Sequence, residues 1–243
     1  MRRFFLDDVL QQDITISGPD AKHIGQVLRL EPGDEILVVG KDGEVGRALL
    51  RQVKTTLVEA SLLEKINERH EPLIEVWLAQ GLPKADKMEY IVQKAVELGA
   101  CGIIPMVARF STVQYDETKR RTRVERWQKI AQEAAKQCGR DRVSVIAPVQ
   151  TLDEILSAVD PETAVIMLYE GDARQGLKEI LSNLTARSYL LLIGPEGGFS
   201  PAEVELCQSH SAHIATLGPR ILRTETAALA AVAILMYQNG DLG

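Results

Sequence analysis

The 243-residue sequence lacks the cysteine and histidine patterns that bind metal ions or build disulfide frameworks. It has no C-x-x-C or H-x-x-x-H motif, and its three cysteines, Cys101, Cys138 and Cys207, are odd in number and widely spaced. These features argue against a zinc site and a disulfide scaffold, and they favour a reducing compartment. Cys138 is a poor candidate nucleophile, because no histidine lies near it in the sequence.

Long apolar runs are also absent. No segment approaches the roughly 18 apolar residues that a membrane span needs, and the apolar part of the N-terminus is too short for a signal peptide. We therefore expect a cytoplasmic protein that does not enter a membrane.

The sequence has no G-x-G-x-x-G after an early strand and no G-x-x-x-x-G-K-[ST] motif. Dinucleotide and nucleoside-triphosphate binding are therefore disfavoured.

Composition and charge are those of an ordinary globular protein. The chain is 45% hydrophobic and 26% charged, so we expect a packed core, in one large domain or in a small and a medium one. The formal net charge is −6, yet residues 119–142 carry nine Lys/Arg side chains against three acidic ones. Such a local basic face can neutralise phosphates, since attraction depends on charges within a Debye length of ~8–10 Å. An ordinary solvated helix face is the alternative.

The pattern in residues 1–70 indicates a small β domain. Turn signals such as Lys41-Asp42-Gly43 separate short alternating runs. Pro19 suits the start of a short helix that would bring Lys22, His23 and Arg29 to one end of a barrel. A small barrel with a basic rim is typical of RNA binding, although His23 alone can equally be structural. The expected strands lie near residues 14–16, 35–39, 45–50 and 56–60.

From Leu73 onward, strands alternate with helices, which predicts a mostly parallel sheet with helices on both faces. The polar segment Glu64–Pro72 is the expected linker. The expected strands in this part are 74–80, 102–107, 144–147 and 164–168, and the expected helices are 88–98, a basic helix through Cys138, and one around 152–158.

Two similar loops near the C-terminal end suggest a ligand site. The strand Leu190–Ile193 ends in Gly194-Pro195, and a strand near 214–217 ends in Gly218-Pro219, so the two Gly-Pro pairs lie 24 residues apart. Glycine lets the backbone approach a ligand, and ligands of α/β sheets bind outside the carboxyl ends of the strands. We therefore expect the two loops to form one pocket, with Tyr169-Glu170-Gly171 as a third wall. Two ordinary tight turns are the alternative.

Four charged residues near these loops are candidates for chemistry. Lys84 and Lys87 follow the strand 74–80, where lysines can bind phosphate, although surface lysines are common. Arg223 follows the second loop, and Glu225 could pair with it and fix its planar fork. Because arginine stays charged, Arg223 is suited to stabilising negative charge and unsuited to acting as a base.

Several segments together carry a family resemblance over nearly the whole chain. The chain resembles the bacterial 16S ribosomal RNA (uracil-N3-)methyltransferases, also called ribosomal RNA small subunit methyltransferase E, of the SPOUT class. The matching segments are Arg2–Phe5, His23–Arg29, Lys87–Gly99, Glu133–Arg140, Ile193–Phe199 and Leu217–Ala227. The last two are specific in combination.

The resemblance implies a fold, a cofactor and a substrate. Residues 1–70 would form a PUA-like β-barrel that binds RNA, and residues 73–243 a SPOUT domain, an α/β fold with a parallel sheet and a deep trefoil knot. The cofactor would be S-adenosylmethionine (SAM), the substrate N3 of a uridine in 16S ribosomal RNA of the small subunit, and the assembly a homodimer with active sites near its interface.

The resemblance and the charge pattern also give candidate site residues. Arg223, Glu225 and Glu196 are the catalytic candidates, with Glu196, Glu225 and solvent all open as the base. The expected cofactor-binding residues are Leu168, Gly194, Pro195, Glu196, Gly197, Leu217, Gly218, Ile221, Leu222 and Thr224. The expected RNA-binding residues are Arg2, Arg3, Lys22, His23, Arg29, Lys84, Lys87, Arg109 and Arg140.

Two other functions stay open. A SPOUT enzyme that methylates another base or a ribose 2′-OH would carry the same loops. An RNA-binding protein without catalysis would explain the barrel and the basic helix, but it would not explain the paired Gly-Pro loops.

Overall fold

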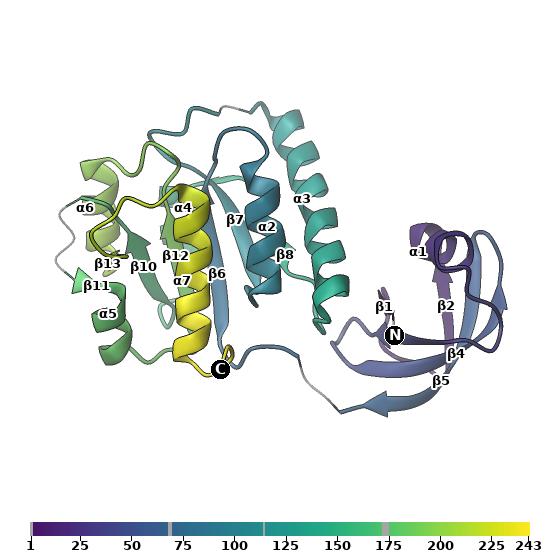
Figure 1. Cartoon of the computed structure of the whole chain (residues 1–243). Coiled ribbons are helices and arrows are strands. Elements are labelled where there is room, and N and C mark those ends of the chain that lie inside the picture. Colours follow the sequence, from purple (N-terminus) through teal and green to yellow (C-terminus); the bar gives the residue numbers. More distant parts are fainter. Residues whose placement is uncertain (1, 68–69, 114, 172–174) are drawn as a thin grey trace. The chain divides into compact units, whose positions relative to one another are not determined.

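The computed structural model describes residues 2–67, 70–113, 115–171 and 175–243 (Figure 1). By its internal contacts the chain divides into two compact units. Unit 1 comprises Met1–Glu71 together with Ala135–Arg142, and unit 2 comprises Pro72–Ala134 together with Val143–Gly243.

Unit 1 is built on a curled five-stranded sheet of order β1-β3-β4-β5-β2. β1 and β3 pair in parallel and the other neighbours are antiparallel, while two register shifts between β4 and β5 bend the sheet. The short helix α1 (Gly18–Lys22) and a π-helical turn η1 (His23–Val27) follow β2. The strands are β1 (Arg3–Phe5), β2 (Asp13–Ser17), β3 (Glu35–Val39), β4 (Val45–Val53) and β5 (Leu57–Ile66).

The four strands predicted in this region are confirmed, and alternate residues of β2 are buried, as the alternating pattern requires. The boundary between the last strand and the linker differs from the prediction. β5 runs to Ile66, so the connecting segment begins later than the predicted Glu64, because the polar residues at the end of β5 still pair with β4. The short strand β1 was not predicted, since three residues give too little periodicity to detect.

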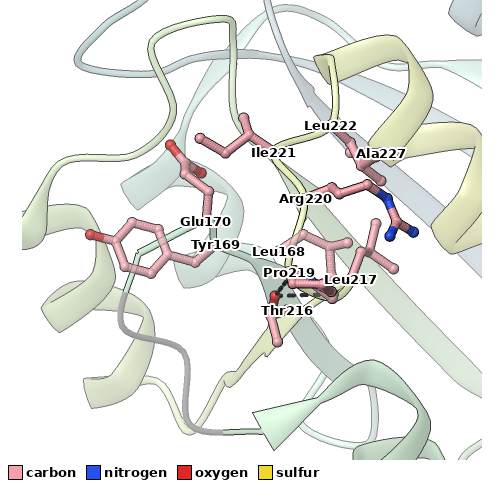
Figure 2. A pocket seen from close by; sticks show the side chains of 11 residues that line it. Leu168, Tyr169, Glu170, Thr216, Leu217, Pro219, Arg220, Ile221, Leu222 and Ala227 are labelled. Atoms are coloured by element: carbon pink, nitrogen blue, oxygen red, sulfur yellow. Dashed lines mark hydrogen bonds between the residues drawn. The ribbon is translucent and has the colours of Figure 1, made fainter.

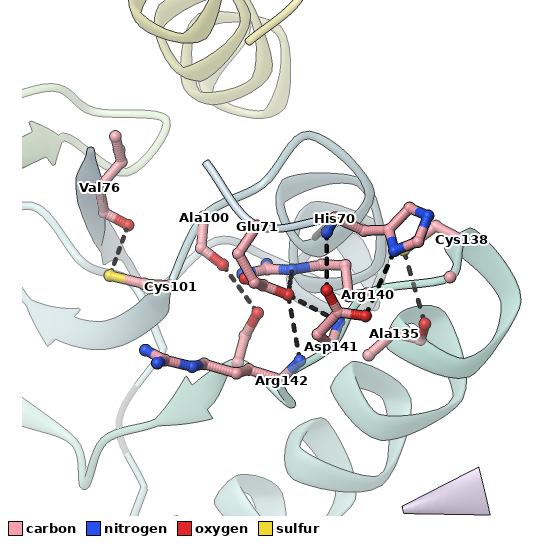
Figure 3. A network of polar contacts seen from close by, with 12 residues as sticks. His70, Glu71, Val76, Ala100, Cys101, Ala135, Cys138, Arg140, Asp141 and Arg142 are labelled. Atoms are coloured by element: carbon pink, nitrogen blue, oxygen red, sulfur yellow. Dashed lines mark hydrogen bonds and ion pairs between the residues drawn. The ribbon is translucent and has the colours of Figure 1, made fainter. Parts of the chain in front are cut away.

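A buried ionic network holds the end of helix α3 (Glu117–Cys138) and the residues after it within unit 1 (Figure 3). Arg3 donates to Asp141 at 2.5 Å and to the carbonyl oxygens of Gly139 and Arg140. The Arg140 guanidinium pairs with Glu71, which also accepts the Asp141 backbone N–H at 2.8 Å. These charges are buried yet paired, which is the condition under which buried charges are tolerated.

Unit 2 contains an eight-stranded sheet whose order is β11-β13-β10-β12-β6-β7-β8, with β9 beside β7. Every pairing in this sheet is parallel, as predicted from the alternation of strands and helices. The strands are β6 (Glu75–Gly81), β7 (Gly102–Val107), β8 (Val145–Ile146), β9 (Gln150–Thr151), β10 (Ala164–Leu168), β11 (Gln175–Gly176), β12 (Ser188–Ile193) and β13 (His213–Thr216).

Helices cover both faces of this sheet. On one face α2 (Lys87–Glu97) and α7 (Thr224–Gln238) contact each other, and α7 contacts β6 and β12. On the other, apolar side chains of α4 (Leu152–Ala158) and α6 (Pro201–Ser209) join alternate strand residues such as Met167 and Leu192 in one core cluster. The short helix α5 (Leu177–Asn183) was not predicted.

Local signals fix the start of α6. The Ser200 hydroxyl accepts the Glu203 backbone N–H, and the Glu203 carboxylate accepts the Ser200 N–H at 2.8 Å. Pro201 occupies the first helical turn, where its missing N–H costs no hydrogen bond. This capping box is the arrangement that Ser200-Pro201-Ala202-Glu203 predicts, and it fixes where the first Gly-Pro loop ends.

Candidate active site

The loops after β12 and β13 converge at the carboxyl ends of the parallel strands, where they line two adjoining cavities. The larger cavity has a volume of about 400 Å³, and the smaller, shown in Figure 2, about 100 Å³. Leu168, Glu170, Ile221, Leu222 and Ala227 line both cavities. The two Gly-Pro loops therefore meet at one end of the sheet, but Gly194 and Pro195 line the larger cavity and Gly218 and Pro219 the smaller, so the one pocket that was predicted is divided in two. Glu170 lines both cavities, and Tyr169 lines the smaller one.

A buried hydroxyl ties the first loop to the start of α7. Thr224 Oγ1 donates to the Gly194 carbonyl oxygen at 2.6 Å and accepts from Gln80 Nε2 at 2.8 Å. Thr224 is 6% exposed, and Gln80, at the end of β6, is fully buried. Gln80 also donates to the Gly81 carbonyl oxygen at 2.9 Å. Gln80 was not among the predicted site residues, although a glutamine at the end of a strand that is otherwise buried is a usable signal.

Lys87 binds two carboxylates at the larger cavity. Its Nζ lies 3.0 Å from Glu196 Oε1 and 3.2 Å from Glu225 Oε2. The expected pair between Glu225 and Arg223 is therefore wrong, since Glu225 pairs with Lys87 instead. The reason is helical geometry, because side chains two residues apart at the start of a helix do not face each other.

These contacts fix the charge state of Glu196. Burial raises the pKa of its carboxyl, but its own backbone N–H, the Lys87 ammonium and the Lys84 backbone N–H together hold that pKa below the ordinary 4.5. The hydrogen bond to Glu196 also raises the pKa of Lys87 above its ordinary 10.5, against the opposing effect of burial. Both groups are therefore charged at neutral pH, and Glu196 is a weak proton acceptor.

Arg223 stands just before α7 with its side chain exposed and lining the larger cavity. Its guanidinium makes no hydrogen bond or ion pair with any residue that the structure describes, although its backbone carbonyl oxygen accepts the Ala227 N–H at 2.8 Å. A guanidinium without a protein partner can bind an anion from solution or a charge that develops during a reaction.

Nine of the ten predicted cofactor-binding residues line one or both cavities. Gly197 lines neither, since it lies against Phe110, whose Cβ would be 2.7 Å from a Cβ at position 197. Gly218 has a φ of +106° and open space where a side chain would be, so ligand atoms can approach its backbone. The nine are Leu168, Gly194, Pro195, Glu196, Leu217, Gly218, Ile221, Leu222 and Thr224.

The predicted RNA-binding residues divide by exposure. Arg3 and Arg140 are buried and engaged in the ionic network of unit 1, so this placement departs from the prediction of an RNA contact. His23 is half-buried with its ring edge-on to Phe4, which fits a structural histidine. Lys87 is held by Glu196 and Glu225. The exposed residues of the set are Arg2, Lys22, Arg29, Lys84 and Arg109.

Along α3, part of the basic face is neutralised within unit 2. Arg126 lies 2.7 Å and Arg123 3.7 Å from Glu89.

In the part of the chain that the structure describes, no group of three or more His, Cys, Asp and Glu side chains is placed to hold a metal ion. No helix of the described ranges is long and apolar enough to cross a membrane.

The chain matches known proteins over nearly its full length. Residues 69–236 match the RNA methyltransferase domain, and residues 16–62 match the RNA methyltransferase PUA domain. Ribosomal RNA small subunit methyltransferase E of Bacillus subtilis is 38% identical, over 98% of this chain and 97% of that protein. The Neisseria gonorrhoeae protein of the same name, solved with bound S-adenosyl methionine, has a TM-score of 0.90 and 30% identity over all of both chains.

A second solved structure agrees. A putative methyltransferase of Legionella pneumophila, also with bound SAM, has a TM-score of 0.86 and 29% identity over 97% of this chain and 96% of that one. The parallel sheet, the paired loops and these matches define the chain as an RNA methyltransferase with a PUA domain. Within that class, it belongs to the ribosomal RNA small subunit methyltransferase E family. The expected fold class is confirmed, and the trefoil knot stays a prediction of the resemblance.

Proposed function

We propose that the protein transfers the methyl group of SAM to N3 of a specific uridine in 16S ribosomal RNA of the small subunit. The observation that carries this proposal is the pair of adjoining cavities that the two Gly-Pro loops line, with Thr224 bound to the first loop, in a chain that belongs to this family over nearly its full length. Because its substrate is ribosomal RNA, we place the enzyme in the cytoplasm.

The residues around the cavities fit SAM. Ligand pockets usually measure about 300–1,000 Å³ and combine apolar walls with a few polar groups. Here Leu168, Ile221 and Leu222 supply apolar surface suited to an adenine ring, and Gly218 opens its backbone to the ligand. Glu170 and Arg223 add charged side chains to the walls of the larger cavity. When bound, SAM supplies a methyl group that its sulfonium has already activated.

The work left to the protein is positioning and charge stabilisation. Holding uracil N3 in line with the methyl group can lower the barrier by up to ~7–11 kcal/mol. As N3 loses its proton, negative charge builds on O2 and O4, which Arg223 is free to stabilise. Glu196 and Glu225 are both bound to Lys87, so of the three acceptors considered we favour solvent for the N3 proton.

We assign RNA binding to unit 1 through the exposed side chains of Arg2, Lys22 and Arg29. Arg2 precedes β1, Lys22 ends α1 and Arg29 follows η1, and none of the three belongs to the core of unit 1, so their charges are available to phosphates. Lys84 and Arg109, exposed in unit 2, are candidates for holding the RNA next to the cavities.

The proposed assembly is a homodimer. Its support in this chain is the exposed apolar surface of α7 and the loop before it, where Ile221 is 85%, Tyr237 70% and Ile234 39% exposed. Large apolar side chains that one protomer leaves in solvent are the kind of surface that a partner subunit can cover. A dimer mass by light scattering at micromolar concentration is expected, and a monomer mass at that concentration would count against the dimer.

One experiment tests the reaction. The purified protein is incubated with labelled SAM in three parallel reactions, which contain 16S ribosomal RNA, small subunits or transfer RNA. The RNA from each reaction is then digested for mass spectrometry. We expect 3-methyluridine at one site in the ribosomal RNA. A methylated ribose or another base would replace the proposed specificity by a different SPOUT activity. Failure to bind SAM in calorimetry, with RNA binding intact, would favour the non-catalytic alternative.

A further inference from the structure

Glu170 is a charged residue of the site that the proposed mechanism leaves without a role. It follows β10, and its side chain lines both the larger and the smaller cavity. In Figure 2 its carboxylate lies beside Ile221, at the wall that the cavities share, while the neighbouring Tyr169 ring points away. Glu170 is exposed, and it makes no hydrogen bond or ion pair with any described residue.

The first Gly-Pro loop leaves space for this carboxylate. A Cβ at Gly198 would overlap the Glu170 carboxylate, so any side chain at position 198 would displace that carboxylate. The loop is held in this shape by the Gly198 N–H, which donates to the Pro195 carbonyl oxygen at 2.9 Å, and by a φ of +67° at Gly198. The position of Glu170 is thus built by two separate segments, the end of β10 and the loop after β12.

Glu170 differs from the other carboxylates around the cavities in its charge partners. Two other carboxylates at the larger cavity, Glu196 and Glu225, share the ammonium of Lys87. Glu170 has no such counterion among the described residues, and apolar side chains of Leu168 and Ile221 line the same walls. An anion beside apolar surface is less well solvated than one in open water, so it favours a ligand that brings a positive charge.

We infer that Glu170 makes the site prefer the positively charged sulfonium of SAM to the neutral thioether of S-adenosylhomocysteine, the product. The inference rests on the proposed function. The two ligands share the adenosine, ammonium and carboxylate groups and differ in the methyl group and the sulfonium charge. Glu170 therefore stabilises the substrate complex selectively, and its attraction for the ligand weakens when the methyl group leaves, which assists product release.

Calorimetry with the full-length protein tests this role. We expect Glu170→Gln to weaken SAM binding about tenfold to thirtyfold and to change S-adenosylhomocysteine binding by less than about threefold, a tenfold change being ~1.4 kcal/mol. Glu170→Asp keeps the charge on a shorter side chain and should keep part of the preference. The matched control is Glu205→Gln, an exposed glutamate of α6 that lines neither cavity. Added salt should reduce the wild-type preference and leave that of Glu170→Gln nearly unchanged.

Several outcomes would overturn the inference. If Glu170→Gln weakened both ligands equally, Glu170 would bind the shared ammonium. If it left both affinities intact and slowed methyl transfer, Glu170 would be a proton acceptor. Because Glu170 pairs with no described residue, we expect unchanged melting of the variant, so a folding defect would also contradict its placement. A wild-type protein that bound no SAM would overturn the proposed function as well, whereas the other outcomes concern Glu170 alone.

Discussion

The Thr224 hydroxyl donates a hydrogen bond of 2.6 Å to the carbonyl oxygen of Gly194, 30 residues earlier in the chain. Thr224 is the first residue of α7, and Gly194 is the first residue after β12. Gln80 completes the link from the end of β6. One buried side chain therefore fixes the separation of the two loops that enclose the cavities, and the shape of the ligand site depends on it.

Replacing Thr224 tests that dependence. Thr224→Val removes the hydroxyl and leaves the Gly194 carbonyl and the Gln80 amide without their buried partner, a loss of about 1–3 kcal/mol. We expect that decrease in the free energy of unfolding, measured in urea, and about tenfold weaker SAM binding in calorimetry, since ~1.4 kcal/mol corresponds to tenfold. Thr224→Ser keeps the hydroxyl and serves as the control. Equal losses in the two variants would show that the hydroxyl is not the link.

Arg223 is expected to serve the chemical step. Removing one donor to a developing anion costs about 10²–10³ in rate, so Arg223→Ala should lower the single-turnover rate by that factor and change SAM affinity only several-fold. Arg223→Lys should recover part of the rate, because lysine keeps the charge and lacks the planar fork. Since the Arg223 guanidinium makes no hydrogen bond or ion pair with a described residue, the melting temperature should not fall. A well-folded Arg223→Ala enzyme with a near-normal rate would remove Arg223 from the catalytic residues.

The features that the sequence predicted well are those encoded by neighbouring residues. Ser200 and Glu203 form a capping box through residues three positions apart, and the strand preceding Gly194 ends where the turn residues begin. The alternation of strands and helices led directly to a parallel sheet. Because parallel strands end at the same side of a sheet, the two Gly-Pro loops lie at that side together, although the loops are separate in sequence.

The features that were missed depend on tertiary contacts. Glu225 pairs with Lys87 of another helix, and proximity in sequence wrongly suggested Arg223. Arg3 and Arg140 resemble surface cations in a sequence, yet Arg3 reaches Asp141 across 138 positions of the chain. No local pattern marks which arginine will be buried, because burial follows from the packing of residues 135–142 with the rest of unit 1.

The ion pair of Glu196 predicts a pH-dependent contribution to stability. Its folded pKa lies below 4.5, so the ionised carboxylate stabilises the fold above that pH, and the contribution disappears as the pH falls through the folded pKa. We expect the difference in unfolding free energy between wild type and Glu196→Gln to be constant near neutral pH and to shrink below about pH 4.5. Urea unfolding at a series of pH values measures it. A difference that persists unchanged in acid would contradict the pair with Lys87.

Lys87→Met provides the second half of this test. The folded pKa of Lys87 is above 10.5, so its contribution is complete below that pH and is lost only as the pH rises through the folded value. In the Lys87→Met background, Glu196→Gln should cost less stability at neutral pH than it costs in the wild type. Additive effects of the two substitutions would show that the side chains do not interact.

The last prediction separates RNA binding from cofactor binding. A fragment beginning near Pro72 is unsuitable, because it would deprive the buried Arg140 of Glu71. Exposed cations of unit 1 can be replaced in the full chain instead. Lys22→Gln combined with Arg29→Gln should weaken ribosomal RNA binding and reduce the slope of log affinity against log salt by about 0.7–0.9 for each phosphate that the protein no longer neutralises. SAM affinity, measured by calorimetry, should stay unchanged.

The matched control is Lys41→Gln, the same change of charge at an exposed turn position between β3 and β4 of unit 1. It lowers the net charge of unit 1 by as much as Lys22→Gln does, but it lies in a different segment from α1 and η1. We therefore expect a clearly smaller effect on RNA affinity and on the salt slope. A specific contact with RNA depends on where a charge lies, whereas long-range attraction depends mainly on how many charges the protein carries. Equal weakening of RNA binding by Lys41→Gln and Lys22→Gln would therefore show that Lys22 acts only through general electrostatic attraction.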